Sequence, residues 1–150
     1  MEITFNLGII LQYHFDTSPE RLFKTYTDPR LIPEWWGPSG LTTEVEKMDV
    51  RPGGSWRYIQ HDGDGNEFAF HGVYQEVLPS ERLVFTFEYE GTPGHSLLET
   101  LNFEGQNGKT KLIEKMLFQS VEDRDGMLSS GVEEGATETM QRLAELLARN

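Results

Sequence analysis

Residues 132–147 read VEEGATETMQRLAELL, and the apolar positions of this stretch recur every three or four residues. Such spacing places a single apolar stripe along an α-helix. Glu, Gln and Arg side chains occupy most of the remaining positions. The stripe consists of Val132, Ala136, Thr139, Met140, Leu143, Leu146 and Leu147. The sequence therefore predicts a long C-terminal helix that packs through one face.

Upstream, between residues 41 and 118, the pattern is typical of strands and tight turns. Short Gly-, Pro-, Asn- and Asp-containing segments separate runs rich in aromatic and β-branched residues. These connections are too short for helical crossovers, so consecutive strands should pair antiparallel. We expect strands at about residues 3–15, 41–50, 54–61, 67–77, 82–90, 96–104 and 109–118.

Two short helices are expected after the first strand. Thr17 and Glu20 have capping-box spacing, and Pro19 suits a first helical turn. The segment 27–29, Thr-Asp-Pro, repeats such a start signal, and the sequence Trp-Trp-Gly-Pro at 35–38 ends the second helix. The order of elements predicts one α+β domain over residues 1–150, with a curved antiparallel sheet of about seven strands.

A helix about 10 Å wide is too narrow to cover a seven-stranded sheet at ~4.8 Å per strand. Side chains must fill the remaining space, or a cavity remains between the sheet and the helix. This mismatch of widths favours a small-molecule site.

Composition excludes several classes of function. The 150 residues include no Cys, which excludes disulfide scaffolds, thiol catalysis and Cys-ligated metal sites. A formal charge of −12 has the wrong sign for binding nucleic acid or an anionic membrane surface. No apolar run approaches the ~20 residues of a membrane span, and we see no secretory signal, so we expect a cytoplasmic protein. No cofactor is expected, and residues 62–66, Asp-Gly-Asp-Gly-Asn, are interpreted as a solvated hairpin turn rather than a metal loop.

Alternation along the strands sorts their side chains into two faces. We assign the largely apolar sets to the face covered by the helix. These inward sets are Trp56 and Tyr58; His71, Val73, Gln75 and Val77; Leu83, Phe85, Phe87 and Tyr89; Leu97, Glu99, Leu101 and Phe103; and Leu112, Glu114, Met116 and Phe118.

Two glutamates interrupt these inward sets. If Phe103 and Thr110 flank the turn at residues 105–108, then Glu99 lies directly opposite Glu114. Two carboxylates so close together in an apolar concavity cannot both stay ionised, so one pKa should rise. A shared proton would suit acid–base chemistry or bind a polar ligand head group. The alternative is a bulge or register slip that turns one glutamate outward, or a solvated mouth that holds both.

Several short motifs resemble one bacterial protein family. Residues 18–23 (SPERLF), 35–38 (WWGP) and 49–56 (DVRPGGSW) are similar to the opening and a turn signature of proteins related to the C-terminal domain of the heat-shock protein 90 ATPase activator. Residues 70–74 (FHGVY), 79–83 (PSERL) and 131–135 (GVEEG) match later signatures.

The resemblance implies the Bet v 1-like, START-related helix-grip fold of the SRPBCC superfamily, with a cavity between the sheet and the long helix. The chain departs from the family pattern at Ala136, where the family commonly has Trp. A smaller side chain here is expected to enlarge the cavity or its entrance if Ala136 faces inward.

Three functional hypotheses follow. The leading hypothesis is the binding of an apolar or amphipathic small molecule without catalysis. A second is a chaperone-interaction module for a heat-shock protein 90 homologue, favoured by an apolar patch on the outer face around Phe70 or Ile113. A third is a cyclase- or hydratase-type enzyme that uses Glu99, Glu114 or His71 as acid and base. The expected ligand-binding residues are Trp56, Tyr58, His71, Phe85, Phe87, Glu99, Leu101, Glu114, Met116, Thr139, Met140 and Leu143.

Overall fold

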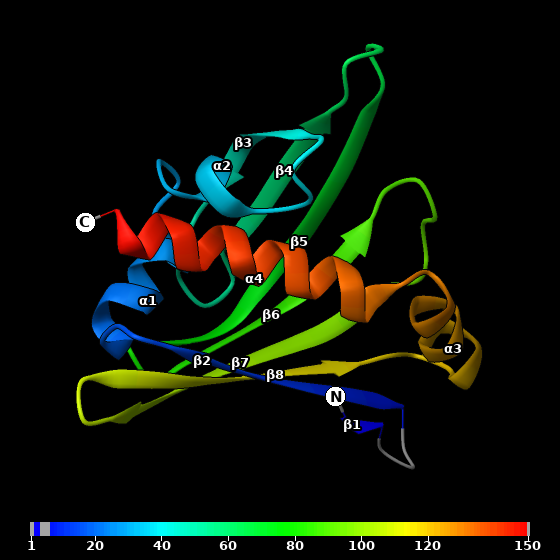
Figure 1. The fold of residues 1–150 in the computed structure, drawn as a ribbon. Helices are drawn as coiled ribbons and strands as arrows, with labels where there is room; N and C mark the ends of the chain where they lie inside the picture. The colour runs from blue at the N-terminus through cyan, green and yellow to red at the C-terminus, as the bar shows by residue number, and fades with distance from the viewer. Residues whose placement is uncertain (1, 4–6, 150) are drawn as a thin grey trace.

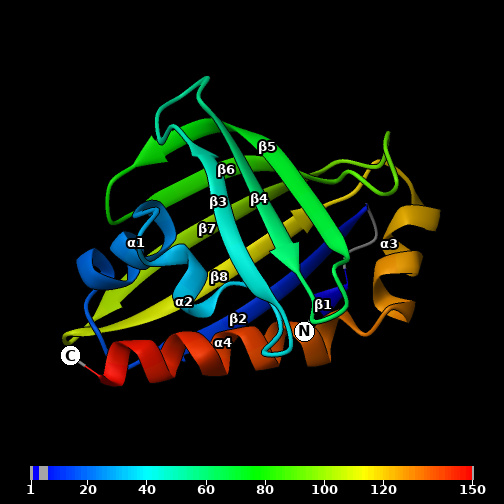
Figure 2. The same ribbon diagram turned by 90° about the horizontal axis from the view of Figure 1, so that it is seen from above.

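A computed structural model describes residues 2–3 and 7–149 of the chain. Its strands form one curved antiparallel sheet in the order β1-β2-β8-β7-β6-β5-β4-β3 (Figures 1 and 2). Every neighbouring pair from β3 to β8 is also consecutive in the chain, as the short turns predict. The strands are β1 Glu2–Ile3, β2 Gly8–Phe15, β3 Thr42–Met48, β4 Ser55–His61, β5 Glu67–Leu78, β6 Arg82–Tyr89, β7 Leu97–Gln106 and β8 Lys109–Leu117.

The first strand differs from the expectation for residues 3–15. In the structure β2 begins at Gly8, and the two-residue strand β1 pairs antiparallel with it, so the chain has already reversed direction. Residues 4–6 of the predicted strand lie outside the described residues. The sheet consequently has seven longer strands and one short edge strand among the described residues.

Helix α4 (Val132–Ala148) crosses the concave side of the sheet, as Figure 1 shows. Its C-terminal half packs into the main core through Leu143, Leu146 and Leu147. The short helices α1 (Pro19–Thr27) and α2 (Ile32–Trp35) fill the same end of the concavity with Leu22, Phe23, Ile32 and Trp35, all of which are buried. The core is therefore concentrated at the end of the sheet where α4 finishes.

The starts of the first two helices differ in detail from the prediction. The N-cap of α1 is Ser18 rather than Thr17, and the Ser18 hydroxyl accepts a hydrogen bond from the Arg21 amide at 3.3 Å. Helix α2 begins only at Ile32, because the segment from Asp28 to Leu31 forms a turn that precedes it.

A third short helix, α3 (Val121–Ser129), was not predicted from the sequence. Ser120 caps this helix by accepting a hydrogen bond from the Asp123 amide at 3.0 Å. None of its residues is fully buried, and its apolar side chains do not form one stripe. The spacing of apolar residues therefore did not predict this helix. Gly131, with a φ of 84°, separates α3 from α4 by adopting the left-handed conformation that glycine permits.

The inward set assigned to β5 was wrong at His71, Val73 and Gln75 and right only at Val77. Gly72 and Tyr74 are buried there and Phe70 packs against the core, whereas Val73 is 42% exposed on the other face. A register shift between Tyr74 and Glu76 then returns Val77 to the core side. Because strand faces alternate with a period of two, the single irregularity reverses the assignment partway along the strand.

No helix of the described chain is both long enough and apolar enough to cross a bilayer.

Candidate functional site

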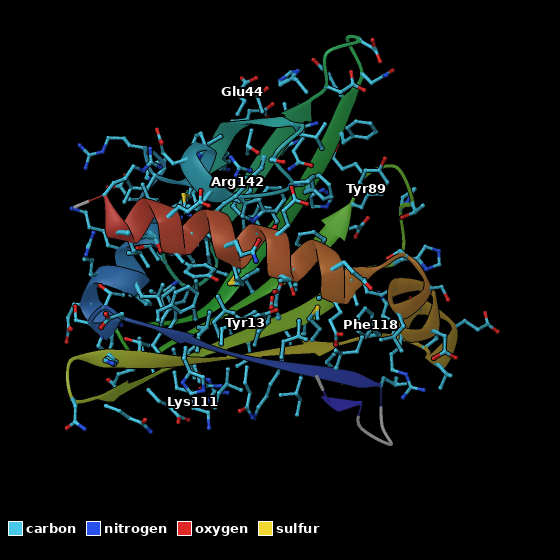
Figure 3. The ribbon with its side chains drawn as sticks, in the orientation of Figure 1. Tyr13, Glu44, Tyr89, Lys111, Phe118 and Arg142 are labelled. Atoms are coloured by element: carbon cyan, nitrogen blue, oxygen red, sulfur yellow. The ribbon has the colours of Figure 1, made fainter. Side chains whose placement is uncertain are left out.

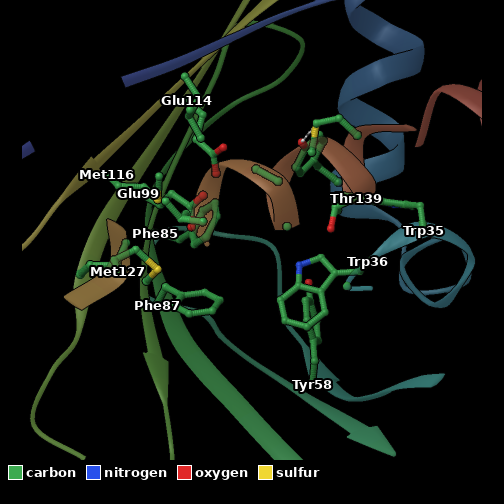
Figure 4. Close-up of a pocket in the computed structure, with 18 of the residues that line it drawn as sticks. Trp35, Trp36, Tyr58, Phe85, Phe87, Glu99, Glu114, Met116, Met127 and Thr139 are labelled. Atoms are coloured by element: carbon green, nitrogen blue, oxygen red, sulfur yellow. Dashed lines mark hydrogen bonds between the residues drawn. The ribbon is translucent and has the colours of Figure 1, made fainter. Parts of the chain in front are cut away.

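The N-terminal half of α4 does not touch the sheet as closely as its C-terminal half, and a partly open cavity of about 430 Å³ lies beneath it. The strands β2 and β4 to β8 supply its floor, α4 and the end of α3 supply one side, and α2 with the following loop supplies another (Figure 4). The cavity predicted from the widths of sheet and helix is thus present. Its α4 lining consists of Val132, Gly135, Ala136, Thr139 and Met140.

Aromatic rings form much of the wall. The Trp36 ring meets Tyr58 edge to face at 5.0 Å between centroids, and Trp56 lies 5.8 Å from Phe87. Residues of even number in β4 and odd number in β6 place these rings on the concave face, as alternation predicts. Trp36 follows directly after α2, and its indole both lines the cavity and packs against the edge of the core.

Trp56 depends on a close approach of two strands. It lies opposite Gly72 in the β4–β5 pairing. A Cβ placed on Gly72 would lie 1.8 Å from the Thr86 carbonyl oxygen and 2.6 Å from Trp56 Nε1. Only glycine fits at this position, because the backbones of neighbouring strands approach closely here.

Glu99 and Glu114 both face the cavity from neighbouring strands. They are not directly opposite, as was predicted: Glu99 pairs with Met116, and Leu101 pairs with Glu114. The reason is a tighter turn in which Asn107 and Gly108 both have positive φ, 54° and 81°. This Asn-Gly turn is a strong hairpin signal, and it would have predicted the observed register. The two glutamates are diagonal neighbours, a spacing that long side chains can bridge.

Figure 4 shows the two carboxyl groups close together on one side of the cavity, with Trp36 and Tyr58 on the other. Burial, followed by the negative charge of Glu114 and a hydrogen bond with its carboxyl group, raises the pKa of Glu99 well above its usual range. The predicted rise of one pKa therefore holds, although the register differs. A carboxyl group with a raised pKa holds its proton to a higher pH, and in that form it can donate a hydrogen bond or a proton to a bound molecule.

Two tyrosines lie near this pair. Burial, then the charge of Glu114, raises the pKa of Tyr26 well above its usual range, so its phenol stays protonated. Its hydroxyl contacts Met140 Sδ at 3.9 Å and links α1 to α4. Burial also raises the pKa of Tyr13, which lies between the sheet and α4 in Figure 3.

Polar contacts hold the loop after α2 against α4 at the rim. The Arg142 guanidinium donates to the Gly37 carbonyl oxygen at 2.7 Å, and Figure 3 shows Arg142 on the side of α4 that faces α2. The Glu138 carboxylate accepts a hydrogen bond from the Ser39 amide at 2.7 Å.

Nine of the twelve expected ligand-binding residues line the cavity. They are Trp56, Tyr58, Phe85, Phe87, Glu99, Glu114, Met116, Thr139 and Met140. Among the additional lining residues are Leu11, Tyr26, Tyr74 and Leu97, and Ala136 is also one of them. Ala136 therefore faces the cavity. This orientation was the condition under which its small side chain was expected to enlarge the cavity.

Three of the expected residues lie elsewhere. Leu101 and Leu143 are buried in the core at 1% and 0% exposure and do not reach the cavity. His71 lies on the outer face, where its Nδ1 is 2.9 Å from a Glu90 carboxylate oxygen that also accepts from Arg57. The inward assignment of β5 produced this error, and it removes His71 from any acid–base chemistry in the cavity.

Two smaller predictions concern the outer surface. Phe70, expected on the outer face, packs instead against Trp36 at 5.3 Å between ring centroids. The loop at 62–66 forms a hairpin turn in which the Asp62 carboxylate accepts hydrogen bonds from the Asp64 and Asn66 amides. Across the described residues, no cluster of three or more His, Asp or Glu side chains is arranged to hold a metal ion.

A curved antiparallel sheet that holds a long C-terminal helix across a cavity defines the helix-grip class of α+β proteins, the Bet v 1-like fold. Within that class the chain belongs to the family described as Activator of Hsp90 ATPase homolog 1-like protein, whose model matches residues 16–148.

Relatives agree with this assignment. The human Activator of 90 kDa heat shock protein ATPase homolog 1 is 28% identical over 105 residues, which are 69% of this chain. The match covers 27% of the length of that curated relative. Protein Ms6760 from Mycobacterium smegmatis is 25% identical with a TM-score of 0.84, over 95% of this chain and 91% of its own. A protein from Rhodobacter sphaeroides is 24% identical with a TM-score of 0.88, over 95% and 93% of the two chains.

Proposed function

We propose that this protein binds an apolar or amphipathic small molecule in the cavity between the sheet and α4. The observation that carries the proposal is the cavity itself. Its volume of about 430 Å³ falls in the usual range for small-molecule sites, ~300–1,000 Å³. Its lining is mainly aromatic and aliphatic, and its two carboxyl groups, of Glu99 and Glu114, lie together on one side (Figure 4). This combination is typical of a site that buries an apolar body and orients one polar end.

Binding of such a ligand requires no catalytic group. Each Å² of apolar surface that a ligand buries contributes roughly 25 cal/mol, so the rings around Trp36 and Phe87 supply binding energy by excluding water. Rings of the lining pack against one another, which reduces the ordering that binding requires.

The test uses N-phenyl-1-naphthylamine, an uncharged dye whose fluorescence rises in apolar surroundings. We expect the wild-type protein to bind it saturably. Ala136→Trp places a large ring in the cavity and should weaken dye binding about tenfold or more, because the space for the ligand is lost. The matched control is Ala144→Trp, since Ala144 lies on the same helix but is exposed. This control should bind the dye as the wild-type protein does.

Circular dichroism melting establishes that both variants are folded. The proposal fails if the wild-type protein shows no saturable signal. It also fails if folded Ala136→Trp binds the dye as tightly as Ala144→Trp.

A second candidate, an interaction with a heat-shock protein 90 homologue, is supported by the family match and the human relative. Burial of Phe70 removes one residue of the apolar patch expected for it, while Val73 and Leu78 of β5 are exposed. Titration of a purified bacterial homologue of the chaperone with the labelled protein tests this candidate. A salt-resistant complex supports it, and no change in anisotropy contradicts it.

A further inference from the structure

Charges of one sign line the cavity. Glu99 and Glu114 are its two acidic residues, and no Lys, Arg or His belongs to its lining. None of the ion pairs formed among the described residues involves either glutamate. The neighbouring lysines of β8, Lys111 and Lys115, occupy the alternate positions of that strand, and Figure 3 shows Lys111 on the side of the sheet away from α4. The protein therefore places two half-buried acids in the cavity with no cation among the lining residues.

The groups that face this pair cannot neutralise it. From β2 and α1, Tyr13 and Tyr26 approach it, and both phenols remain protonated and uncharged because burial raises their pKa values. From α4, Glu133 adds a further negative charge near Tyr13. A buried carboxylate without a cation is costly, and that cost falls when a positive group arrives.

The aromatic part of the lining suits the same kind of ligand. The Phe87 ring lies 6.3 Å from the Trp36 ring and 5.8 Å from the Trp56 ring, centroid to centroid. Aromatic faces attract cations and also bury apolar carbon. A molecule with an apolar body and a positive end therefore finds a complementary surface at both ends of the cavity.

We infer that the cavity selects amphipathic amines, whose ammonium group binds at the Glu99 and Glu114 carboxyl groups while the apolar part lies against the aromatic wall. This inference rests on the proposed function and specifies the ligand class for it. An ammonium group donates charge-assisted hydrogen bonds to the carboxylates, and its charge replaces the proton that the pair otherwise retains. An anionic amphiphile such as a fatty acid brings a further negative charge to the same place and is disfavoured.

The experiment compares three ligands that differ only at one end: 4-phenylbutylamine, 4-phenylbutan-1-ol and 4-phenylbutanoate. Each displaces the dye from wild-type protein at pH 7.5, and the competition yields three dissociation constants. We expect the amine to bind about tenfold or more tightly than the alcohol, and the carboxylate to bind more weakly than the alcohol.

The double variant Glu99→Gln/Glu114→Gln keeps the shape of both side chains and removes their charge. In this variant the amine-to-alcohol affinity ratio should fall to about one. The double variant Glu104→Gln/Glu122→Gln changes the net charge equally at two exposed positions, and it should keep the wild-type ratio. This control separates the local effect of the pair from the general charge of −12.

The outcomes distinguish the two proposals. If the dye binds but the amine and the alcohol compete equally, or the carboxylate competes best, the inference about ligand class is wrong and the cavity still binds ligands. The inference is also wrong if the cavity double variant retains the amine preference. If the dye and all three ligands fail to bind, the proposed function itself is wrong.

Discussion

At the residue scale, Glu99 is notable because its pKa is raised well above the usual range of a carboxyl group. It is an acidic residue in an apolar concavity, and its partner Glu114 is also an acid. Such pairs cannot lose both protons at neutral pH without a compensating cation. The fold keeps this arrangement although a neutral side chain at residue 99 would avoid its cost. That cost is the reason to regard the pair as part of a binding site.

The pair makes a prediction about stability and pH. Because the pKa of Glu99 is higher in the folded chain than in the unfolded chain, where it is about 4.3, the folded chain holds a proton that the unfolded chain releases. The free energy of unfolding therefore falls as pH rises above about 4.3, by at most ~1.4 kcal/mol per pH unit for one proton. Glu99→Gln holds no titrating proton, so the variant should gain stability relative to wild type as pH rises.

Urea unfolding of both proteins between pH 4.5 and 8.5 measures this difference. The exposed substitution Glu104→Gln serves as the control and should show a nearly constant difference from wild type. A constant difference for Glu99→Gln as well would show that the folded-state pKa of Glu99 is ordinary.

At the element scale, the strands β4, β5 and β6 form the aromatic wall only because β5 approaches its neighbours closely at Gly72. The Trp56 indole lies over this glycine, and the Thr86 carbonyl oxygen lies beside it. The same strand carries the bulge after Tyr74 that brings Val77 back to the core side. Two local irregularities in one strand therefore shape the wall.

We expect Gly72→Ala to destabilise the protein by about 1–3 kcal/mol, because the added methyl group overlaps the backbone of β6. The matched control is Gly126→Ala in α3, where a Cβ meets no atom within 4 Å. This change should be neutral or stabilising by up to about 1 kcal/mol, since alanine favours a helix over glycine. Urea unfolding compares the two variants. Equal effects would mean that β5 and β6 are not closely apposed at residue 72.

At the scale of the whole molecule, one helix covers a sheet that is far wider than itself. The short helices α1 and α2 complete the cover at the C-terminal end of α4, where Leu143, Leu146 and Leu147 are buried. At the other end α3 contributes Met127 and Ser130 to the rim and fills little of the space. The cavity lies at that end because fewer elements cover it.

This uneven packing predicts different costs for truncations along α4. Leu143→Ala removes a fully buried side chain and should destabilise the protein by about 3 kcal/mol or more. Met140→Ala, one helical turn earlier in the same helix, should cost less than half as much, because Met140 already borders the cavity and is only partly buried. Thermal or urea unfolding checks this, and equal losses would indicate that both halves of α4 are packed alike.

Much of this molecule is determined by its sequence alone. Periodicity and turn composition predict the antiparallel order of strands and the long amphipathic helix, because the spacing of apolar residues is a local property that either element must satisfy. The quoted motifs likewise indicate the family, which the match over residues 16–148 confirms. The mismatch between helix and sheet widths predicts a cavity, and a cavity is present.

Only the tertiary structure decides which side chains meet there. The outward position of His71 depends on which face of β5 packs against the core, whereas the pairing of Leu101 with Glu114 follows from the local Asn-Gly turn. A slip of one residue exchanges the two faces of a strand, so a bulge such as the one after Tyr74 changes the lining of the site. Which face of β5 turns inward is settled by contacts between segments far apart in the chain, and the local spacing of residues does not contain that information.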